Sequence, residues 1–135
     1  GKRPRATLTP ALAIKDKRPF LSFAVQGGDT QDQNLLQFFL NMVEFEMNVQ
    51  EAAEAANVNS YQMYSSFGTH SKEAGRIVVR DDTPPWVIKD LRSKGYNVVT
   101  RRLTSGPINA IWFDHKNGTM WGGSSNFGED YGIGW

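Results

Sequence analysis

The spacing of hydrophobic positions along the chain predicts a mixture of strands and helices. Short runs rich in β-forming residues predict strands over 8–15, 20–25, 76–79, 96–100, 108–114 and 119–122. Apolar residues at every third or fourth position predict helices over 31–45 and 49–56, and Thr83-Pro84-Pro85 opens a third helix that Gly95 ends. The polar stretch 57–72 indicates an irregular crossing with one short strand. Strands and helices are thus both expected, with no internal repeat.

The first predicted helix is apolar on nearly every side. Its main stripe is Leu35, Phe38, Phe39, Met42 and Val43, widened by Leu36, Leu40 and Phe45. The polar strip that remains is Gln37, Asn41 and Glu44. A helix with this pattern is expected to be buried on most sides. On the third helix, we expect Trp86, Val87 and Leu91 to face inward.

Turn and cap residues separate these elements. Asn117-Gly118 is the strongest hairpin signal in the chain, and Asn48 is well placed to cap the second helix. Two positions run against the usual turn chemistry. Lys17, between the first two strands, and Glu46, between the first two helices, stand where a tight turn or a helix end normally requires glycine.

The composition is that of one globular domain and excludes several classes of function. The 135 residues include 15 basic and 14 acidic side chains, which argues against nucleic-acid binding driven by bulk charge. The basic start, Lys2 to Arg5, fits a solvated arm, with phosphate binding as the alternative. The sequence contains no apolar run of about 18 residues or more, so it predicts no membrane span. No signal peptide is visible. The absence of cysteine excludes disulfides and thiolate zinc sites.

The titratable residues predict neither a catalytic triad nor a metal centre. His70 and His115 are the two histidines, and both are expected to be ordinary surface residues, because neither has the spacing of a Ser-His-Asp triad. No histidine and carboxylate share the spacing of metal ligands. Asp81-Asp82 fits a solvated loop before a helix N-terminus. We therefore expect no metal ion and no cofactor.

The paired glycines Gly27 and Gly28 are the strongest candidate for chemistry. They follow a predicted strand and precede Asp29 and Thr30, which are good residues to begin a helix. Strand, two glycines and helix N-terminus together bring several backbone N–H groups and the positive helix end to one place. Such an arrangement can hold an anion or a developing oxyanion. A plain tight turn is the alternative interpretation of the same residues.

Four segments resemble the γ-glutamyltransferase (glutathione hydrolase) family. Residues 2–10 resemble its Lys-Arg-Pro-x-Ser-Ser-Met-Ser-Pro segment, and residues 20–29 resemble its strand and Pro-Gly-Gly-Ser turn. Residues 36–56 resemble its long buried helix and the Gln-Glu-Ala helix that follows, and residues 108–123 resemble its final hairpin. The resemblance covers nearly the whole chain and keeps the family's order.

The resemblance implies a fold and a reaction. The implied fold is α+β and is part of an N-terminal-nucleophile hydrolase αββα sandwich, with antiparallel sheets and flanking helices. Residues 1–135 would form a single domain, the C-terminal portion of the small subunit. The reaction is hydrolysis or transfer of a γ-glutamyl amide through an acyl-enzyme formed on a threonine. The N–H groups of Gly27 and Gly28 would form the oxyanion hole. Ala6 and Thr7 would occupy the serine pair that binds the substrate's α-carboxylate.

Departures from the family's pattern limit what this chain is expected to do. The family's threonine precedes the Lys-Arg-Pro segment and Gly1 has no hydroxyl, so the chain is expected to be inactive alone. We expect it to pair with the rest of its precursor or to self-associate. Ala6 lacks a hydroxyl donor worth about 1–3 kcal/mol, which admits amides other than glutathione. A non-catalytic assembly module that reuses this half-fold is the alternative, and localisation stays open, although the family is often periplasmic or extracellular.

Overall fold

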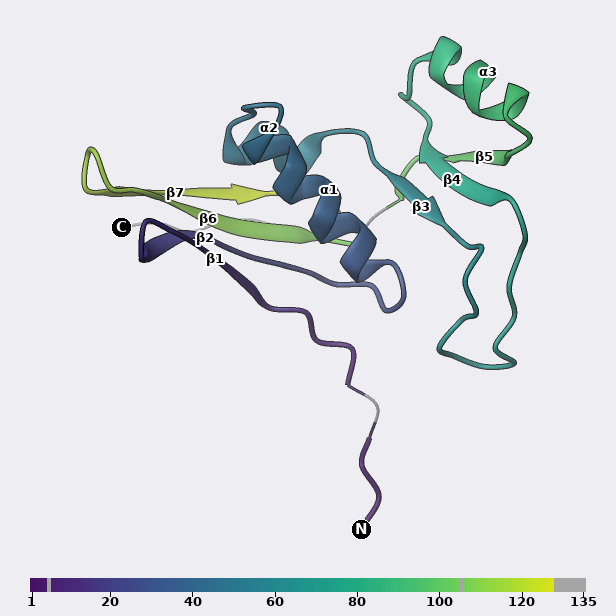
Figure 1. Cartoon of the computed structure of the whole chain (residues 1–135), viewed down its shortest axis with the longest axis horizontal. Helices are drawn as coiled ribbons and strands as arrows, with labels where there is room; N and C mark the ends of the chain where they lie inside the picture. Colours follow the sequence, from purple (N-terminus) through teal and green to yellow (C-terminus); the bar gives the residue numbers. More distant parts are fainter. Residues whose placement is uncertain (5, 105, 128–135) are drawn as a thin grey trace.

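A computed structural model describes residues 1–4, 6–104 and 106–127 of the chain (Figure 1). Its elements are β1 (Ala11–Lys15), β2 (Arg18–Val25), α1 (Gln31–Val43), α2 (Val49–Glu54), β3 (Val58–Ser60), β4 (Arg76–Arg80), α3 (Pro85–Ser93), β5 (Asn97–Arg101), β6 (Ile108–Asp114) and β7 (Thr119–Ser124). The elements follow the predicted order, and the expected α+β class is confirmed. Residues 128–135, at the end of the sequence, lie outside the described residues.

The strands form two sheets that lie side by side (Figure 1). The larger has the order β1-β2-β6-β7 and is antiparallel throughout. The smaller has the order β3-β4-β5, with β3 antiparallel and β5 parallel to β4. The expectation of antiparallel sheets is therefore wrong for the smaller sheet. The chain crosses from β4 to β5 through α3, and a helical crossover returns the second strand in the same direction as the first.

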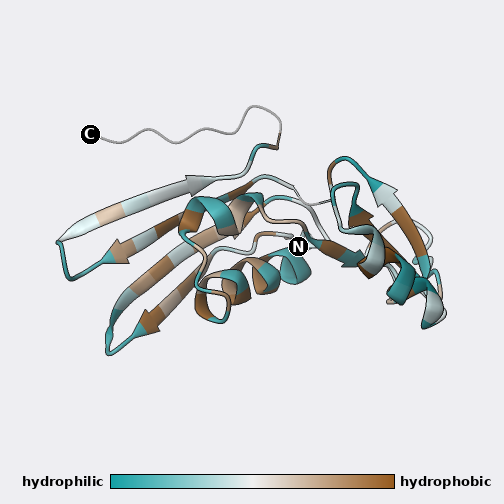
Figure 2. Cartoon of the chain, turned by 90° about the horizontal axis from the view of Figure 1, so that it is seen from above, coloured by the Kyte–Doolittle hydropathy of each residue, from teal (hydrophilic) through white to brown (hydrophobic). Residues whose placement is uncertain are grey.

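Helices α1 and α2 cover one face of the larger sheet (Figure 1). Alternation along β2 turns Leu21, Phe23 and Val25 toward these helices, and Leu21 is completely buried. The ring of Phe23 lies 5.6 Å from that of Phe38 on α1. Figure 2 shows hydrophobic residues along the strands and hydrophilic residues in the hairpin turns. The main core therefore lies between this sheet face and the two helices.

The first helix is less buried than its sequence predicts. Its buried residues are Gln31, Asn34, Leu35 and Phe38, which mark one face only. By contrast, 58% of Leu36 and 68% of Phe45 is exposed. Within the described residues, α1 packs on the larger sheet, on α2 and on β3, and this leaves Leu36, Val43 and Phe45 exposed.

The third helix is also rotated relative to expectation. Trp86 is 72% exposed, so its predicted inward orientation is wrong. Ile88 and Leu91 instead pack against the buried strand residues of the smaller sheet, so the prediction holds for Leu91. On a helix of 3.6 residues per turn, Ile88 and Leu91 share a face that Trp86 does not.

The turns adopt the backbone geometry that the two unusual residues suggested. Asp16 and Lys17 join β1 to β2 with φ values of 52° and 61°, and Glu46 has a φ of 55°. Positive φ at both central residues is typical of the type I′ hairpin turn, whose twist matches that of the strands. Each non-glycine residue costs roughly 1–2 kcal/mol in this region. The predicted hairpin is confirmed, but β1 begins at Ala11 rather than Leu8.

Two glutamine side chains of α1 join that helix to β3. Nε2 of Gln37 donates to the Val58 carbonyl at 2.8 Å, and Oε1 of Gln37 accepts from the Val58 N–H at 2.8 Å. Gln33 makes the same pair of bonds with Ser60, at 3.1 and 2.7 Å. We call these four bonds the glutamine clamp.

The glutamine clamp forms because the spacing of residues along the helix matches the spacing of residues along the strand. Residues four apart on a helix are separated by about 6 Å along its axis, and residues two apart on a strand by about 6.6 Å. Gln33 and Gln37 can therefore face Ser60 and Val58 at the same time. The two amides pair with the edge of β3 as a neighbouring strand would, which protects an edge that otherwise attracts other chains.

We predict that Gln33→Ala lowers the free energy of unfolding by about 1–3 kcal/mol, because it leaves the N–H and C=O of Ser60 without their partners. Gln33→Glu should also destabilise, since a carboxylate accepts from the N–H but cannot donate to the carbonyl. Urea denaturation measures both. Asn41→Ala, on the same helix, is the control. Equal stabilities for Gln33→Ala and the unmutated chain would contradict the role of the clamp.

The turn between β6 and β7 makes the hairpin sensitive to acid. The Asp114 carboxylate accepts from the Asn117 side chain at 2.6 Å and from the N–H groups of Lys116 and Asn117. The bond from the Asn117 side chain is the main reason that the pKa of Asp114 is lowered from its ordinary value of 3.8. Because the pKa of Asp114 is lower in the folded chain than in the unfolded chain, the ionised carboxylate stabilises the fold. This contribution is fully present above the ordinary pKa and is lost as the pH falls through the pKa of the folded chain.

We predict that Asp114→Asn lowers stability at neutral pH and removes part of the stability loss that the unmutated chain shows below about pH 4. Thermal unfolding measured between pH 7 and pH 2 tests this. Asp81→Asn, in an exposed loop, serves as the matched carboxylate control. A pH profile that is identical for Asp114→Asn and the unmutated chain would show that this carboxylate does not set the acid response.

Candidate functional site

Gly27 and Gly28 form a sharp turn between the end of β2 and the start of α1. Their φ values are +155° and +87°, which L-amino acids with side chains rarely adopt. Regular sheet pairing ends just before them, where the Gln26 N–H donates to the Pro107 carbonyl at 3.2 Å. After them, the Gln31 N–H donates to the Gly28 carbonyl at 3.1 Å as α1 begins.

The amides of Gly27 and Gly28 make no hydrogen bond within the described part of the chain. Across residues 1–4, 6–104 and 106–127, no acceptor receives a hydrogen bond from either N–H. Gly27 is exposed and Gly28 half-buried. Both precede the N-terminal end of α1, where the helix dipole favours negative charge. Chemically, this turn is able to donate two hydrogen bonds to an anion or to a carbonyl oxygen that becomes negative.

Two neighbouring loops hold this turn through three contacts. The Phe67 ring packs on Gly28, whose Cβ, if present, would lie 3.0 Å from Cε2 of that ring. The Ser66 N–H donates to Oδ2 of Asp29 at 2.7 Å. Gly106 lies so close to the backbone of Gln26 that any side chain there would overlap it. The turn is therefore fixed from the loop after β3 and from the loop before β6.

Sequence reasoning missed these supporting residues. Asp29 was expected to help begin the helix, yet its carboxylate bonds Ser66 of a distant loop. The cap position of α1 is Thr30, whose side chain makes no capping bond. Phe67 was one aromatic residue among several in an irregular stretch, and no local signal connects it with Gly28. At Asn48, in contrast, the predicted cap is confirmed as a capping box with Glu51.

Ala6 and Thr7 lie in an extended arm before β1, and both are exposed. Ala11 pairs with Phe23, so the arm leaves the sheet at the end where β2 turns into Gly27 and Gly28 (Figure 1). Within the described residues, no hydrogen bond joins Ala6 or Thr7 to the glycine turn. The arm that carries Ala6 and Thr7 and the turn that contains Gly27 and Gly28 therefore lie at the same end of the larger sheet.

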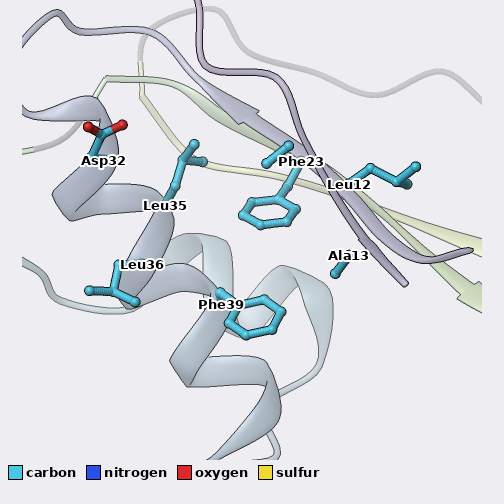
Figure 3. Close-up of a pocket in the computed structure, with 8 residues that line it drawn as sticks. Leu12, Ala13, Phe23, Asp32, Leu35, Leu36 and Phe39 are labelled. Carbon is cyan, nitrogen blue, oxygen red and sulfur yellow. The ribbon is translucent and has the colours of Figure 1, made fainter. Parts of the chain in front are cut away.

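An apolar groove lies between β1 and α1, close to this end (Figure 3). Its volume is about 370 Å³, and it is lined by Ala11, Leu12, Ala13, Phe23, Asp32, Leu35, Leu36 and Phe39. None of the four predicted site residues lines it. Asp32 is its single charged residue, so the groove offers contact surface rather than a set of reacting groups.

The other candidate residues have structural contacts. His115 is exposed and accepts from Arg18 through Nδ1 at 2.8 Å, so its Nε2–H donates to the Pro19 carbonyl at 2.6 Å. His70 is exposed, with Nδ1 at 2.8 Å from the Ser65 carbonyl. The bond from the Arg80 guanidinium lowers the pKa of Asp82, so this acid is ion-paired rather than solvated alone.

The described residues contain no cluster of three or more side chains suited to holding a metal ion. Lys2 and Arg3 of the basic arm are exposed, while Arg5 lies outside the described residues. None of the described helices is both long enough and apolar enough to cross a bilayer.

The fold matches part of longer solved structures. An acivicin-inhibited γ-glutamyltranspeptidase superposes with a TM-score of 0.77 at 23% identity, with 96% of this chain and 64% of that chain covered. The structure of LmbA2991T421A superposes with a TM-score of 0.89 at 30% identity, covering 98% of this chain and 24% of that one.

The sequence comparisons give the family. The model of the γ-glutamyltranspeptidase family matches residues 1–135, and the chain belongs to this family. It is 31% identical to the glutathione hydrolase proenzyme of Bacillus subtilis (strain 168), covering 98% of this chain and 21% of that protein. It is 28% identical to the acylase ACY 1 proenzyme of Pseudomonas sp. (strain V22), covering 90% of this chain and 20% of that protein. The chain thus spans about a fifth of the length of these curated relatives.

We predict that Gly28→Ala destabilises the chain by about 1–3 kcal/mol, since it combines an unfavourable positive φ with a contact at 3.0 Å on Phe67. Gly118→Ala is the matched control. Gly118 also has a positive φ, but a side chain there would meet open space, so that variant carries the backbone strain alone. Chemical denaturation measures both. Equal losses would mean that Phe67 does not restrict the turn.

Proposed function

We propose that this chain is a C-terminal part of a γ-glutamyltransferase-like amidohydrolase and contributes the oxyanion-binding side of its active site. The observation that carries the proposal is the pair of adjacent glycine amides with no internal acceptor among the described residues, held at positive φ beside the start of α1. Paired N–H groups with this arrangement suit a carbonyl oxygen that gains negative charge.

In the proposed reaction, a threonine hydroxyl on another segment of the precursor attacks the carbonyl carbon of a γ-glutamyl-type amide. The carbon–oxygen double bond opens to a tetrahedral oxyanion, toward which the N–H groups of Gly27 and Gly28 donate. The α-amine of the threonine takes up the hydroxyl proton during the attack and passes it to the leaving amine as the double bond re-forms, which gives an ester on the threonine. Water or a second amine then attacks that ester and forms a tetrahedral oxyanion at the same place. This oxyanion collapses as the threonine oxygen leaves with a proton from the α-amine, which releases the acid or the new amide. A single oxyanion donor contributes about 2.7–4 kcal/mol to such steps.

Substrate recognition is proposed to involve Ala6 and Thr7 on the arm. The Thr7 hydroxyl would donate to the α-carboxylate of the substrate, while Ala6 offers no donor. A carboxylate bound through fewer donors is held less tightly, so this site would tolerate acyl groups that differ from γ-glutamyl. Similarity to both a glutathione hydrolase and an acylase is in keeping with a relaxed choice of amide.

The partner proposed for this chain is the remainder of its precursor, with self-association as the alternative. Among the residues that the structure describes, helices cover one face of the larger sheet and nothing covers the other. On the opposite face, the strands carry the exposed apolar residues Leu12, Ile14, Ile111 and Met120. A face of this kind normally packs on another layer, and the second sheet of an αββα sandwich would supply it. A non-catalytic assembly module would use the same face.

The test is γ-glutamyl-p-nitroanilide turnover by this chain alone and by the enzyme assembled with the threonine-bearing segment. The chain alone is expected to be inactive and the assembly active. In the assembly, Ala6→Ser should raise kcat/KM roughly five- to 150-fold, the equivalent of about 1–3 kcal/mol. The control substrate is 4-aminobutyryl-p-nitroanilide, which lacks the α-carboxylate and should not respond. An inactive assembly would favour the non-catalytic module.

A further inference from the structure

The loop that follows β3 returns to the glycine turn and contacts it at two consecutive residues. Phe67 packs its ring edge on Gly28, and Ser66 donates its N–H to the Asp29 carboxylate. The loop thereby contacts the turn at the glycine and at the residue after it. Both contacts join residues that lie outside the helices and strands.

The loop is held in shape by its own hydrogen bonds. The Ser65 N–H donates to the Ser71 carbonyl at 2.8 Å, and the His70 N–H donates to the Phe67 carbonyl at 3.1 Å. At the base of the loop, the Glu73 N–H donates to the Tyr61 carbonyl at 3.0 Å. The preceding residue, Ser60, is fixed to α1 by the glutamine clamp. Phe67 therefore lies on a loop whose conformation is fixed by these hydrogen bonds.

The direction of the Gly28 N–H depends on the φ and ψ angles on either side of it. Two glycines in succession have more accessible backbone conformations than any other pair, so they hold a given N–H direction poorly by themselves. A ring packed on the α-carbon of Gly28 reduces this freedom, because rotation of the turn would drive the backbone into the ring. The N–H groups gain a fixed direction before any ligand arrives, which an oxyanion site needs.

We propose that Phe67 is the positioning residue of the Gly27–Gly28 turn, which it locks in the conformation that aims both amides toward the substrate carbonyl. This inference rests on the proposed function for its catalytic consequence, but its structural part stands apart from it. Phe67 acts through Gly28 and touches no reacting atom. The oxyanion forms in the transition state, so Phe67 would favour the transition state over the bound substrate. Loss of the Phe67 ring should therefore lower kcat more than it raises KM.

The first measurement is made on the chain labelled with 15N-glycine, by two-dimensional NMR. Phe67→Ala is expected to lower the 15N order parameters of the Gly27 and Gly28 amides, while Phe67→Leu, which keeps an apolar side chain on Gly28, lowers them less. Tyr64→Ala is the matched control, since it removes an exposed aromatic residue of the same loop that packs with Lys72. Order parameters of both glycines that stay unchanged in Phe67→Ala would overturn the proposal.

The second measurement is made on the assembled enzyme. Phe67→Ala should lower kcat at least about tenfold, and by no more than the roughly 10²- to 10³-fold loss expected when a whole oxyanion donor is removed. KM should change little, Phe67→Leu should recover part of the loss, and Tyr64→Ala should have unmutated kcat. Loss through KM alone would overturn the positioning role. If the unmutated assembly has no turnover, the proposed function fails while the NMR result still decides the structural part.

Discussion

The hydrogen-bonded contact between helix α1 and strand β3 sets the arrangement of both sheets and of the glycine turn. Gln33 and Gln37 satisfy both backbone groups of Ser60 and Val58, so the smaller sheet is attached to the helix that covers the larger one. The start of α1 fixes where β2 must end, and hence where Gly27 and Gly28 lie. The end of β3 fixes where the next loop begins, and that loop returns to Gly28 through Phe67.

Buried amides reinforce this junction. Oδ1 of Asn34 on α1 accepts from the Asn57 side chain, which in turn accepts from the Thr104 hydroxyl. Asn59 on β3 donates to the Thr104 carbonyl, and both Asn34 and Asn59 are 1% exposed. Apolar packing tolerates small rotations, whereas amide pairs have directions, so a polar junction defines the relative orientation of its elements more sharply. This orientation brings the loops after β3 and before β6 to the glycine turn.

The chemistry proposed for the chain follows from what the fold leaves unsatisfied. Sheets and helices consume most backbone donors, and the described structure leaves two adjacent ones at the turn between β2 and α1. It also leaves the second face of the larger sheet without cover. Together, the unused amides and the bare face fit a chain that completes a larger enzyme. The family membership and the coverage of about a fifth of its curated relatives agree with this view.

The order of elements, the first hairpin, the Asn48 cap, the family and the position of Gly27 and Gly28 could all be predicted from the amino-acid sequence, because periodicity, turn residues and motifs are local properties. The sequence did not determine the parallel pairing of β4 with β5, the exposure of Trp86 and Phe45, or the role of Phe67. Those depend on which surfaces meet after the chain has folded. Gln37 shows the difference well, since its polarity was visible in the helical pattern, but its partner on β3 lies 21 residues away and is brought near only by the tertiary fold.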